Sequence, residues 1–259
     1  MGVLAVKLAF APALVVGSTV LARHYGPRLG GLAAALPAVA GPVLLVFALE
    51  QGAGFASDAS AAALLGVVAL CGFIACFCRM AFRRGWMASL LAGWCAYAIA
   101  VVLLSLVDVA DEVALVSSWL AIAVTFFSLP KAADGAISLE PPGWDLPMRA
   151  LATVTLILCL AVTAERFGPE LSGLLTPFPV IASVLAAFTL GQAGADETVR
   201  VMGGLLLGLF AFATFFYVLA VSLDSASIAS AFTVALVACL AIQLVMLYTT
   251  ASRGRRARR

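Results

Sequence analysis

The chain has 259 residues, of which 64% are hydrophobic and only 11% are charged, and its formal net charge is +2. Soluble domains contain roughly 45–50% apolar and about 25% charged residues, so this composition excludes an ordinary soluble globular protein. The composition instead indicates a protein that keeps most of its surface in lipid.

Nine apolar runs are long enough to cross a bilayer as helices, which takes about 20 residues each. In chain order the runs are 5–22, 29–49, 59–78, 85–107, 113–130, 147–164, 171–191, 201–223 and 226–250. Charged residues separate them, and the proline-containing stretch 131–148 is the main linker. We therefore predict an all-α integral membrane protein with nine transmembrane helices.

Basic residues are distributed unequally between the two sides that these nine spans define. If the N-terminus is outside, 13 of the 15 lysines and arginines fall on the cytoplasmic side, and only Lys7 and Arg166 lie outside. Because short cytoplasmic loops are enriched in basic residues, we expect an N-out, C-in protein of the bacterial inner membrane. We interpret the arginine-rich tail 251–259 as a topology anchor at anionic lipid headgroups, and not as a nucleic-acid site.

Residues 24–52 and 166–194 resemble each other at a fixed offset of 142, with 8 identities in the 27 positions from Gly26 to Gly52. The matches include glycines and prolines, which the Ala/Leu-rich composition does not explain. The paired positions are Gly26 with Gly168, Pro27 with Pro169, Gly31 with Gly173, Pro37 with Pro179, and Gly52 with Gly194. The sequence therefore predicts an internal repeat.

The same offset maps the first four spans onto the last four and leaves span 113–130 without a partner. Equivalent positions are five helices apart, so the second unit is inverted relative to the first. We expect a first four-helix repeat at 1–107, a linking helix and cytoplasmic loop at 108–146, an inverted repeat at 147–250, and the tail. Such repeats are typical of secondary transporters. The alternative is a duplication kept only for packing.

Proline and glycine interrupt the second span of each predicted unit near its middle. A proline removes a backbone donor and frees a carbonyl, and in lipid such groups need a neighbour, water or a ligand. We therefore take the substrate site to lie between these segments, although kinks shaped for packing would give the same pattern. The candidate substrate-binding residues are Pro37, Gly41, Pro42, Glu50, Thr176, Pro177, Pro179, Ser183 and Gln192.

Ionisable side chains are sparse within the predicted spans, and we expect no carboxylate deep in any of them. Glu50, at the end of the broken second span, is the best candidate for a proton-coupling group, with a solvated helix end as the alternative. Motifs of hydrolases and nucleotide-binding enzymes are missing, and the cysteines lie in apolar runs. We therefore expect no enzyme activity, no catalytic residue, no metal site and no cofactor.

Residues 171–222 resemble the GlpM-like family of small bacterial inner-membrane proteins. The resemblance rests on the small-Gly-Leu sequence before Pro177-Phe178-Pro179, the turn near Gly194, and the aromatic run Phe215-Phe216-Tyr217-Val218. It implies a unit of about four helices, associated with production of an envelope polysaccharide, alginate. The chain then looks like two such units fused through a linking helix.

Two hypotheses for function follow. The first is a small secondary transporter or exporter of unknown substrate. The second is a non-transporting accessory membrane protein that supports envelope polysaccharide biosynthesis. The expected partners are the lipid bilayer and a small molecule or ion, without nucleic acid, and a homodimer is left open.

Overall fold

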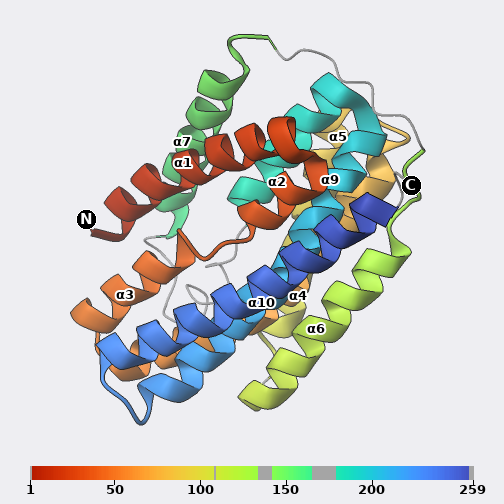
Figure 1. Ribbon diagram of the computed structural model, residues 1–259. Helices are drawn as coiled ribbons and strands as arrows, with labels where there is room; N and C mark the ends of the chain where they lie inside the picture. Colours follow the sequence, from red (N-terminus) through yellow and green to blue (C-terminus); the bar gives the residue numbers. More distant parts are fainter. Residues whose placement is uncertain (1, 108, 134–141, 165–178, 257–259) are drawn as a thin grey trace.

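The computed structural model describes residues 2–107, 109–133, 142–164 and 179–256, and every regular element among them is an α-helix (Figure 1). The helices are, in chain order, α1 (Gly2–Tyr25), α2 (Pro27–Ala34), α3 (Ala40–Glu50), α4 (Ala53–Ala81), α5 (Trp86–Leu104), α6 (Asp111–Ser128), α7 (Asp145–Ala164), α9 (Val180–Leu223) and α10 (Ile228–Arg256). Within these ranges the all-α prediction is confirmed.

Five helices in the described part of the chain, α4, α5, α6, α9 and α10, are long and apolar enough to cross a membrane. A helix satisfies its own backbone hydrogen bonds, which is why apolar segments of this length are stable in lipid. The fold is that of a multi-pass membrane protein, whereas the count of nine spans stays a prediction.

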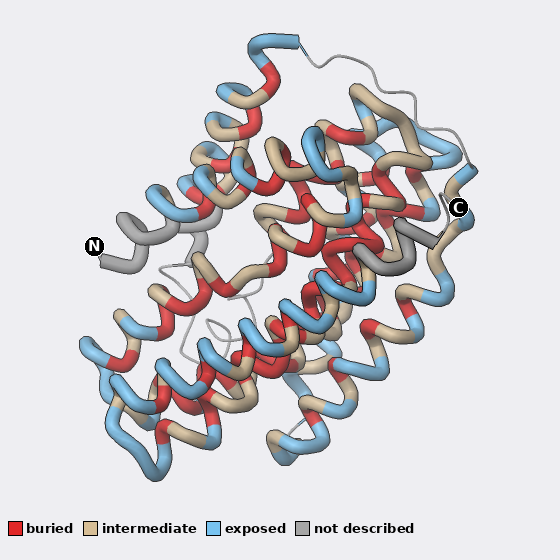
Figure 2. The backbone as a smooth tube through the Cα atoms, in the orientation of Figure 1, coloured by how far each residue is buried: buried red, intermediate tan, exposed pale blue. Residues whose placement is uncertain are grey.

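Helices α4 and α9 pack against each other and form the buried centre of the bundle. Helices α5 and α6 pack on α4, and α10 packs on α9. The outward faces of α6 and α10 are exposed along their length (Figure 2) and carry large apolar side chains such as Leu120, Phe127 and Leu244. An apolar surface of this extent would be covered by lipid tails.

Three glycines with positive φ begin new helical segments: Gly26 (100°), Gly52 (95°) and Gly194 (84°). Side chains rarely adopt this backbone conformation, so glycine is required at these turns. Gly194 interrupts α9, which is therefore two helices that meet at this residue. The separate spans predicted at 171–191 and 201–223 are joined through it, because the charged residues after Gly194 continue the helix and do not form a loop.

Helix boundaries recur at a spacing of 142 residues. Helix α4 ends at Ala81 and α9 ends at Leu223, while α5 begins at Trp86 and α10 begins at Ile228. The glycines that begin α4 and the second part of α9 have the same spacing and similar φ and ψ. The packing of the two halves also corresponds, because α5 packs on α4 in the first half and α10 packs on α9 in the second.

Helix α2 lies unusually close to α9. A Cβ atom built on Gly31 would stand 1.9 Å from the carbonyl oxygen of Val201, and one on Gly204 would stand 2.1 Å from the carbonyl oxygen of Arg28. Small residues permit such backbone contact between membrane helices. The contact fixes the position of α2. This helix ends directly before the segment around Pro37, where the candidate site lies.

Candidate functional site

The segment around Pro37 is not helical. Helix α2 ends at Ala34 and α3 begins at Ala40, and turns occupy the residues between them. The first backbone hydrogen bond beyond Pro37 runs from the N–H of Gly41 to the carbonyl of Pro37, at 2.8 Å. Gly41 is buried, and a Cβ on it would lie 3.5 Å from the ring of Phe215. The second predicted span is therefore broken at the position where its proline removes a donor.

Pro42 lies in the first turn of α3 and does not interrupt it. A proline is tolerated there, because the first N–H groups of a helix have no partner within the helix. Of the candidate prolines in the first half, only Pro37 lies at the break.

In the second half, Pro179 directly precedes α9, and the backbone N–H of Ser183 donates to its carbonyl at 2.7 Å. Ser183 is buried, and its hydroxyl accepts a hydrogen bond of 2.9 Å from the indole Nε1 of Trp94 on α5. Thr176 and Pro177 lie outside the described residues. Ser183 therefore links α9 to α5.

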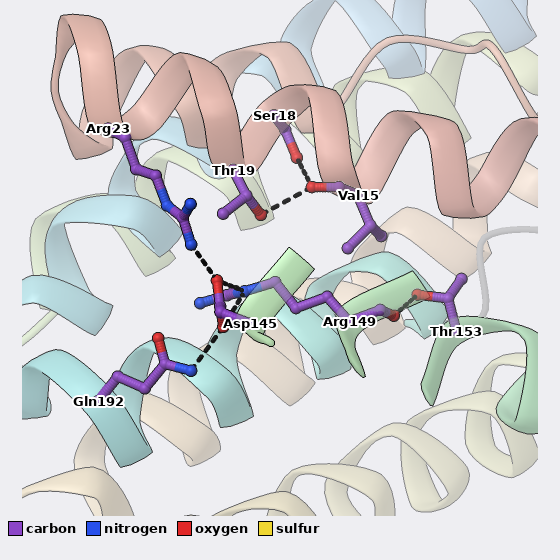
Figure 3. A network of polar contacts seen from close by, with 8 residues as sticks. All are labelled: Val15, Ser18, Thr19, Arg23, Asp145, Arg149, Thr153 and Gln192. Atoms are coloured by element: carbon purple, nitrogen blue, oxygen red, sulfur yellow. Dashed lines mark hydrogen bonds and ion pairs between the residues drawn. The ribbon is translucent and has the colours of Figure 1, made fainter. Parts of the chain in front are cut away.

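The most strongly polar site in the described structure is centred on Asp145, the first residue of α7 (Figure 3). Its carboxylate is completely buried and accepts hydrogen bonds from three side chains on three helices. These are Arg23 at the end of α1, Arg149 one turn along α7, and Gln192 on α9. We call these four residues the Asp145 cluster.

Within the Asp145 cluster, Arg149 is the more deeply buried arginine. Its Nε lies 2.9 Å from both carboxylate oxygens of Asp145, and its guanidinium carbon lies 5.1 Å from the centre of the Phe188 ring on α9. The Arg149 side chain is 5% exposed, whereas that of Arg23 is 30% exposed. The spacing of four residues places Asp145 and Arg149 on one face of α7.

The helices beside the cluster carry hydroxyl groups that are satisfied locally. Ser18 and Thr19 both donate to the carbonyl of Val15 on α1, at 3.0 and 2.7 Å, and Thr153 donates to the carbonyl of Arg149 on α7, at 2.7 Å (Figure 3). Such bonds within one helix let small polar residues occupy a helix interface without leaving a donor unpaired. These buried hydroxyls beside the cluster therefore have their donors satisfied within their own helices.

The Asp145 cluster holds two positive charges against one negative charge. A buried charge without a partner is strongly destabilising, and removing one member of a buried pair typically costs about 3–5 kcal/mol. The single carboxylate therefore ties α1, α7 and α9 together. The cluster therefore has one positive charge in excess, and the more exposed Arg23 can donate to an additional acceptor.

Sequence reasoning did not identify the buried carboxylate of Asp145, because the expectation concerned carboxylates within the predicted spans and Asp145 lies before one. In the sequence this residue belongs to the proline-rich linker, two residues before the predicted span 147–164, and it reads as a loop charge. The arginines read as charges that set topology. The spacing of four between Asp145 and Arg149 was the available signal. Burial of the start of α7 between α1 and α9 depends on tertiary packing, which the sequence does not display.

Two other candidates have contrasting positions. Gln192 takes part in the Asp145 cluster, where its side-chain amide donates from α9 to the carboxylate on α7. Glu50, at the equivalent position of the first half, is the exposed last residue of α3. Among the described residues, no group of three His, Cys, Asp or Glu side chains could hold a metal ion.

No protein-family model, curated protein or solved structure matches this chain.

Proposed function

We propose that the protein is a small secondary transporter or exporter of the bacterial inner membrane, with its substrate site at the interruption between α2 and α3. The observation that carries this proposal is the set of free backbone groups around Pro37. In the described part of the chain, the carbonyls of Ala34, Ala35 and Leu36 accept no backbone hydrogen bond, and the N–H groups of Ala38 and Val39 donate none.

Free backbone groups at membrane depth are tolerated only where they are buried in protein or line a water-filled cavity. Each unpaired polar group costs roughly 1–3 kcal/mol, so several together favour a segment that is satisfied by a solute or water. Transporters commonly place their substrate at such broken helices. A small polar solute would find both donors and acceptors here.

The proposal includes nine spans arranged as two inverted four-helix repeats around α6. It is supported by the spacing of 142 residues between helix boundaries and between the glycines of positive φ. Ion clusters buried in membrane proteins often mark transport pathways, which is the second support. The Asp145 cluster lies where the first helices of the two units, α1 and α7, meet α9.

The proposed orientation, N-out and C-in, is supported by the separation of charge. Arg79, at the end of α4, donates to the carbonyl of Ser128 at the end of α6, at 3.2 Å. At the other end of α6, Asp111 lies close enough to Asp58 and Asp224 to feel the repulsion of their charges. The Ser128 end of α6 thus has the basic Arg79 and Arg200 beside Asp196 and Glu197, whereas carboxylates gather at the Asp111 end, and basic residues favour the cytoplasmic side.

The accessory role keeps one supporting feature, the resemblance of residues 171–222 to the GlpM-like family and its association with envelope polysaccharide. Fold or family likeness alone is a weak basis for function. The broken helix favours transport, because an accessory protein has no need of free backbone groups inside the bundle.

Transport can be tested with the purified full-length chain in proteoliposomes. Solid-supported membrane electrophysiology would record charge movement after concentration jumps of a panel of amino acids, organic acids, amines and sugars, under imposed Na⁺, K⁺ and pH gradients. The key variant is Pro37→Ala, which restores a backbone donor and favours a continuous helix. The matched control is Pro12→Ala, because Pro12 lies inside α1 without interrupting it.

We expect at least one solute to produce a saturable current that Pro37→Ala abolishes and Pro12→Ala retains. If no solute in the panel moves and a polysaccharide synthase co-purifies with the chain from its native membrane, the transporter proposal is wrong and the accessory role is favoured. Equal currents from the two proline variants would refute the site at the α2–α3 break.

A further inference from the structure

Gln243, near the middle of α10, has a side-chain oxygen with no partner. The residue is 7% exposed, and its Nε2 donates to the carbonyl of Leu32 on α2 at 2.7 Å. Its Oε1 is buried and has no hydrogen-bond partner among the described residues. The amide orientation is fixed chemically, because the Leu32 carbonyl can only accept a hydrogen bond.

A buried amide oxygen without a donor typically costs about 1–3 kcal/mol, so its presence requires an explanation. A leucine at position 243 would avoid the cost. The glutamine instead bridges α10 and α2 at the last turn of α2, directly before the break.

The end of α2 presents further acceptors. Leu32 and Ala33 accept the N–H groups of Ala35 and Leu36, at 3.3 and 3.2 Å, and these bonds close the last turn of the helix. The next three carbonyls, those of residues 34–36, accept no backbone hydrogen bond in the described structure. A helix C-terminus carries a partial negative charge, so these groups attract positive charge.

Gln243 donates to the carbonyl of Leu32, which lies two residues before the first of these three carbonyls. The orphan oxygen belongs to the same amide group, so it lies beside the end of α2, directly before the break.

The chemistry of this group of atoms is specific. All are neutral oxygen acceptors, and the donor capacity of Gln243 is directed at Leu32. Neutral oxygens suit a monovalent cation, since Ca²⁺ and Mg²⁺ sites in proteins are built with carboxylates. Unwound carbonyls and the C-terminal ends of half-helices bind such ions in transporters.

We propose that Gln243 Oε1 and the free carbonyls at the end of α2 bind a desolvated monovalent cation. This inference rests on the proposed function in one respect: in a transporter the cation is either the coupling ion or the charged amine of the substrate. Cation binding itself can be measured without transport.

The test uses the purified full-length chain in nanodiscs, with thermal unfolding measured at constant ionic strength. Choline chloride is replaced stepwise by NaCl, KCl or methylammonium chloride, and binding of ²²Na⁺ is measured directly by scintillation proximity. The variant Gln243→Leu removes the oxygen while keeping the volume, and Gln243→Glu places a carboxylate oxygen at the same point.

The matched control is Ser118→Ala. Ser118 is also fully buried and donates from one helix, α6, to a carbonyl of another, that of Leu64 on α4 at 2.7 Å. Its loss removes a comparable hydrogen bond between helices away from the break.

We expect at least one small cation to raise the unfolding temperature saturably relative to choline. Gln243→Leu should weaken its apparent affinity by at least about tenfold, which corresponds to roughly 1.4 kcal/mol. Ser118→Ala should leave the affinity unchanged, and Gln243→Glu should strengthen it. A response to Na⁺ or K⁺ identifies a coupling ion, and a response only to methylammonium identifies a substrate amine.

The proposal is overturned if no cation stabilises the protein more than choline does, or if Gln243→Leu responds as the wild type does. If Gln243→Leu does not fold, an unchanged cation affinity in Gln243→Glu overturns the proposal instead. A solute current in a protein that binds none of these cations would refute the cation site and leave transport standing. Cation binding without any solute current would refute transport and leave the cation site standing.

Discussion

The substitution Asp145→Asn tests whether the Asp145 cluster holds α1, α7 and α9 together. It keeps the size of the side chain and removes its charge, so two guanidinium groups lose the one acidic partner that they have among the described residues. Arg149 lies 2.9 Å from the carboxylate oxygens, which places the charge centres about 4 Å apart. At an effective dielectric constant near 20, that attraction is worth about 4 kcal/mol before the cost of desolvation.

The contribution of Arg23 is smaller, because its side chain is 30% exposed and water screens the pair. Exposed pairs contribute about 0–1 kcal/mol. Removing one partner from a buried pair leaves the other charge uncompensated, and measured costs for this are about 3–5 kcal/mol. We expect Asp145→Asn to lower the free energy of unfolding by this amount.

The measurement is unfolding by SDS in mixed micelles, followed by circular dichroism and extrapolated to zero denaturant. The matched control is Asp196→Asn, since Asp196 accepts a single, solvent-exposed hydrogen bond of 2.7 Å from the backbone of Ala133. The double variant Asp145→Asn with Arg149→Met removes a buried charge of each sign. It should lose at least about 1 kcal/mol less stability than the two single changes summed, because the residues are coupled.

A loss of less than about 0.5 kcal/mol for Asp145→Asn, within the range of ordinary surface substitutions, would refute the reasoning. It would mean that the cluster is solvated and that the three helices are held by apolar packing alone. An equal loss in Asp196→Asn would refute it as well.

Three further outcomes are expected in the same unfolding assay. Gly31→Ala should be destabilising by at least about 2 kcal/mol, because its Cβ would stand 1.9 Å from the carbonyl oxygen of Val201; near wild-type stability would show that α2 and α9 are not in backbone contact. Gly194→Ala should cost about 1–2 kcal/mol through its φ of 84°, and a neutral effect would contradict the break in α9. Ser183→Ala removes the acceptor of the Trp94 indole and should cost about 0.5–1.5 kcal/mol, and a stabilising effect would contradict that bond.

The membrane-spanning character could be predicted from the sequence, because runs of about 20 apolar residues have few other stable solutions. The break at Pro37 was also predictable, since a proline inside an apolar run removes a donor wherever the helix lies. Both inferences depend only on local chemistry.

The Asp145 cluster could not be predicted, because its four residues come from positions as far apart as 23 and 192. Asp145 lies beside prolines in a linker, and its spacing of four from Arg149 is the one local feature that differs from a solvated loop carboxylate. The unpaired oxygen of Gln243 could not be predicted for the same reason. The residue that its Nε2 contacts, Leu32, is 211 residues away in the sequence. Sequence pattern identifies helices, whereas contacts between helices decide which polar groups are buried.

The glycine contact between α2 and α9 also constrains how the protein can move. Because Gly31 and Gly204 bring the two backbones together, α2 cannot slide or rotate on α9 without a steric clash. Helix α2 and the helix that begins at Gly194 therefore behave as one rigid body. Any rearrangement that opens or closes the break has to displace α3, with Pro37 at one end of the moving element and the hinge glycine Gly52 at the other. The helix that such a rearrangement would displace is the one that ends in Glu50.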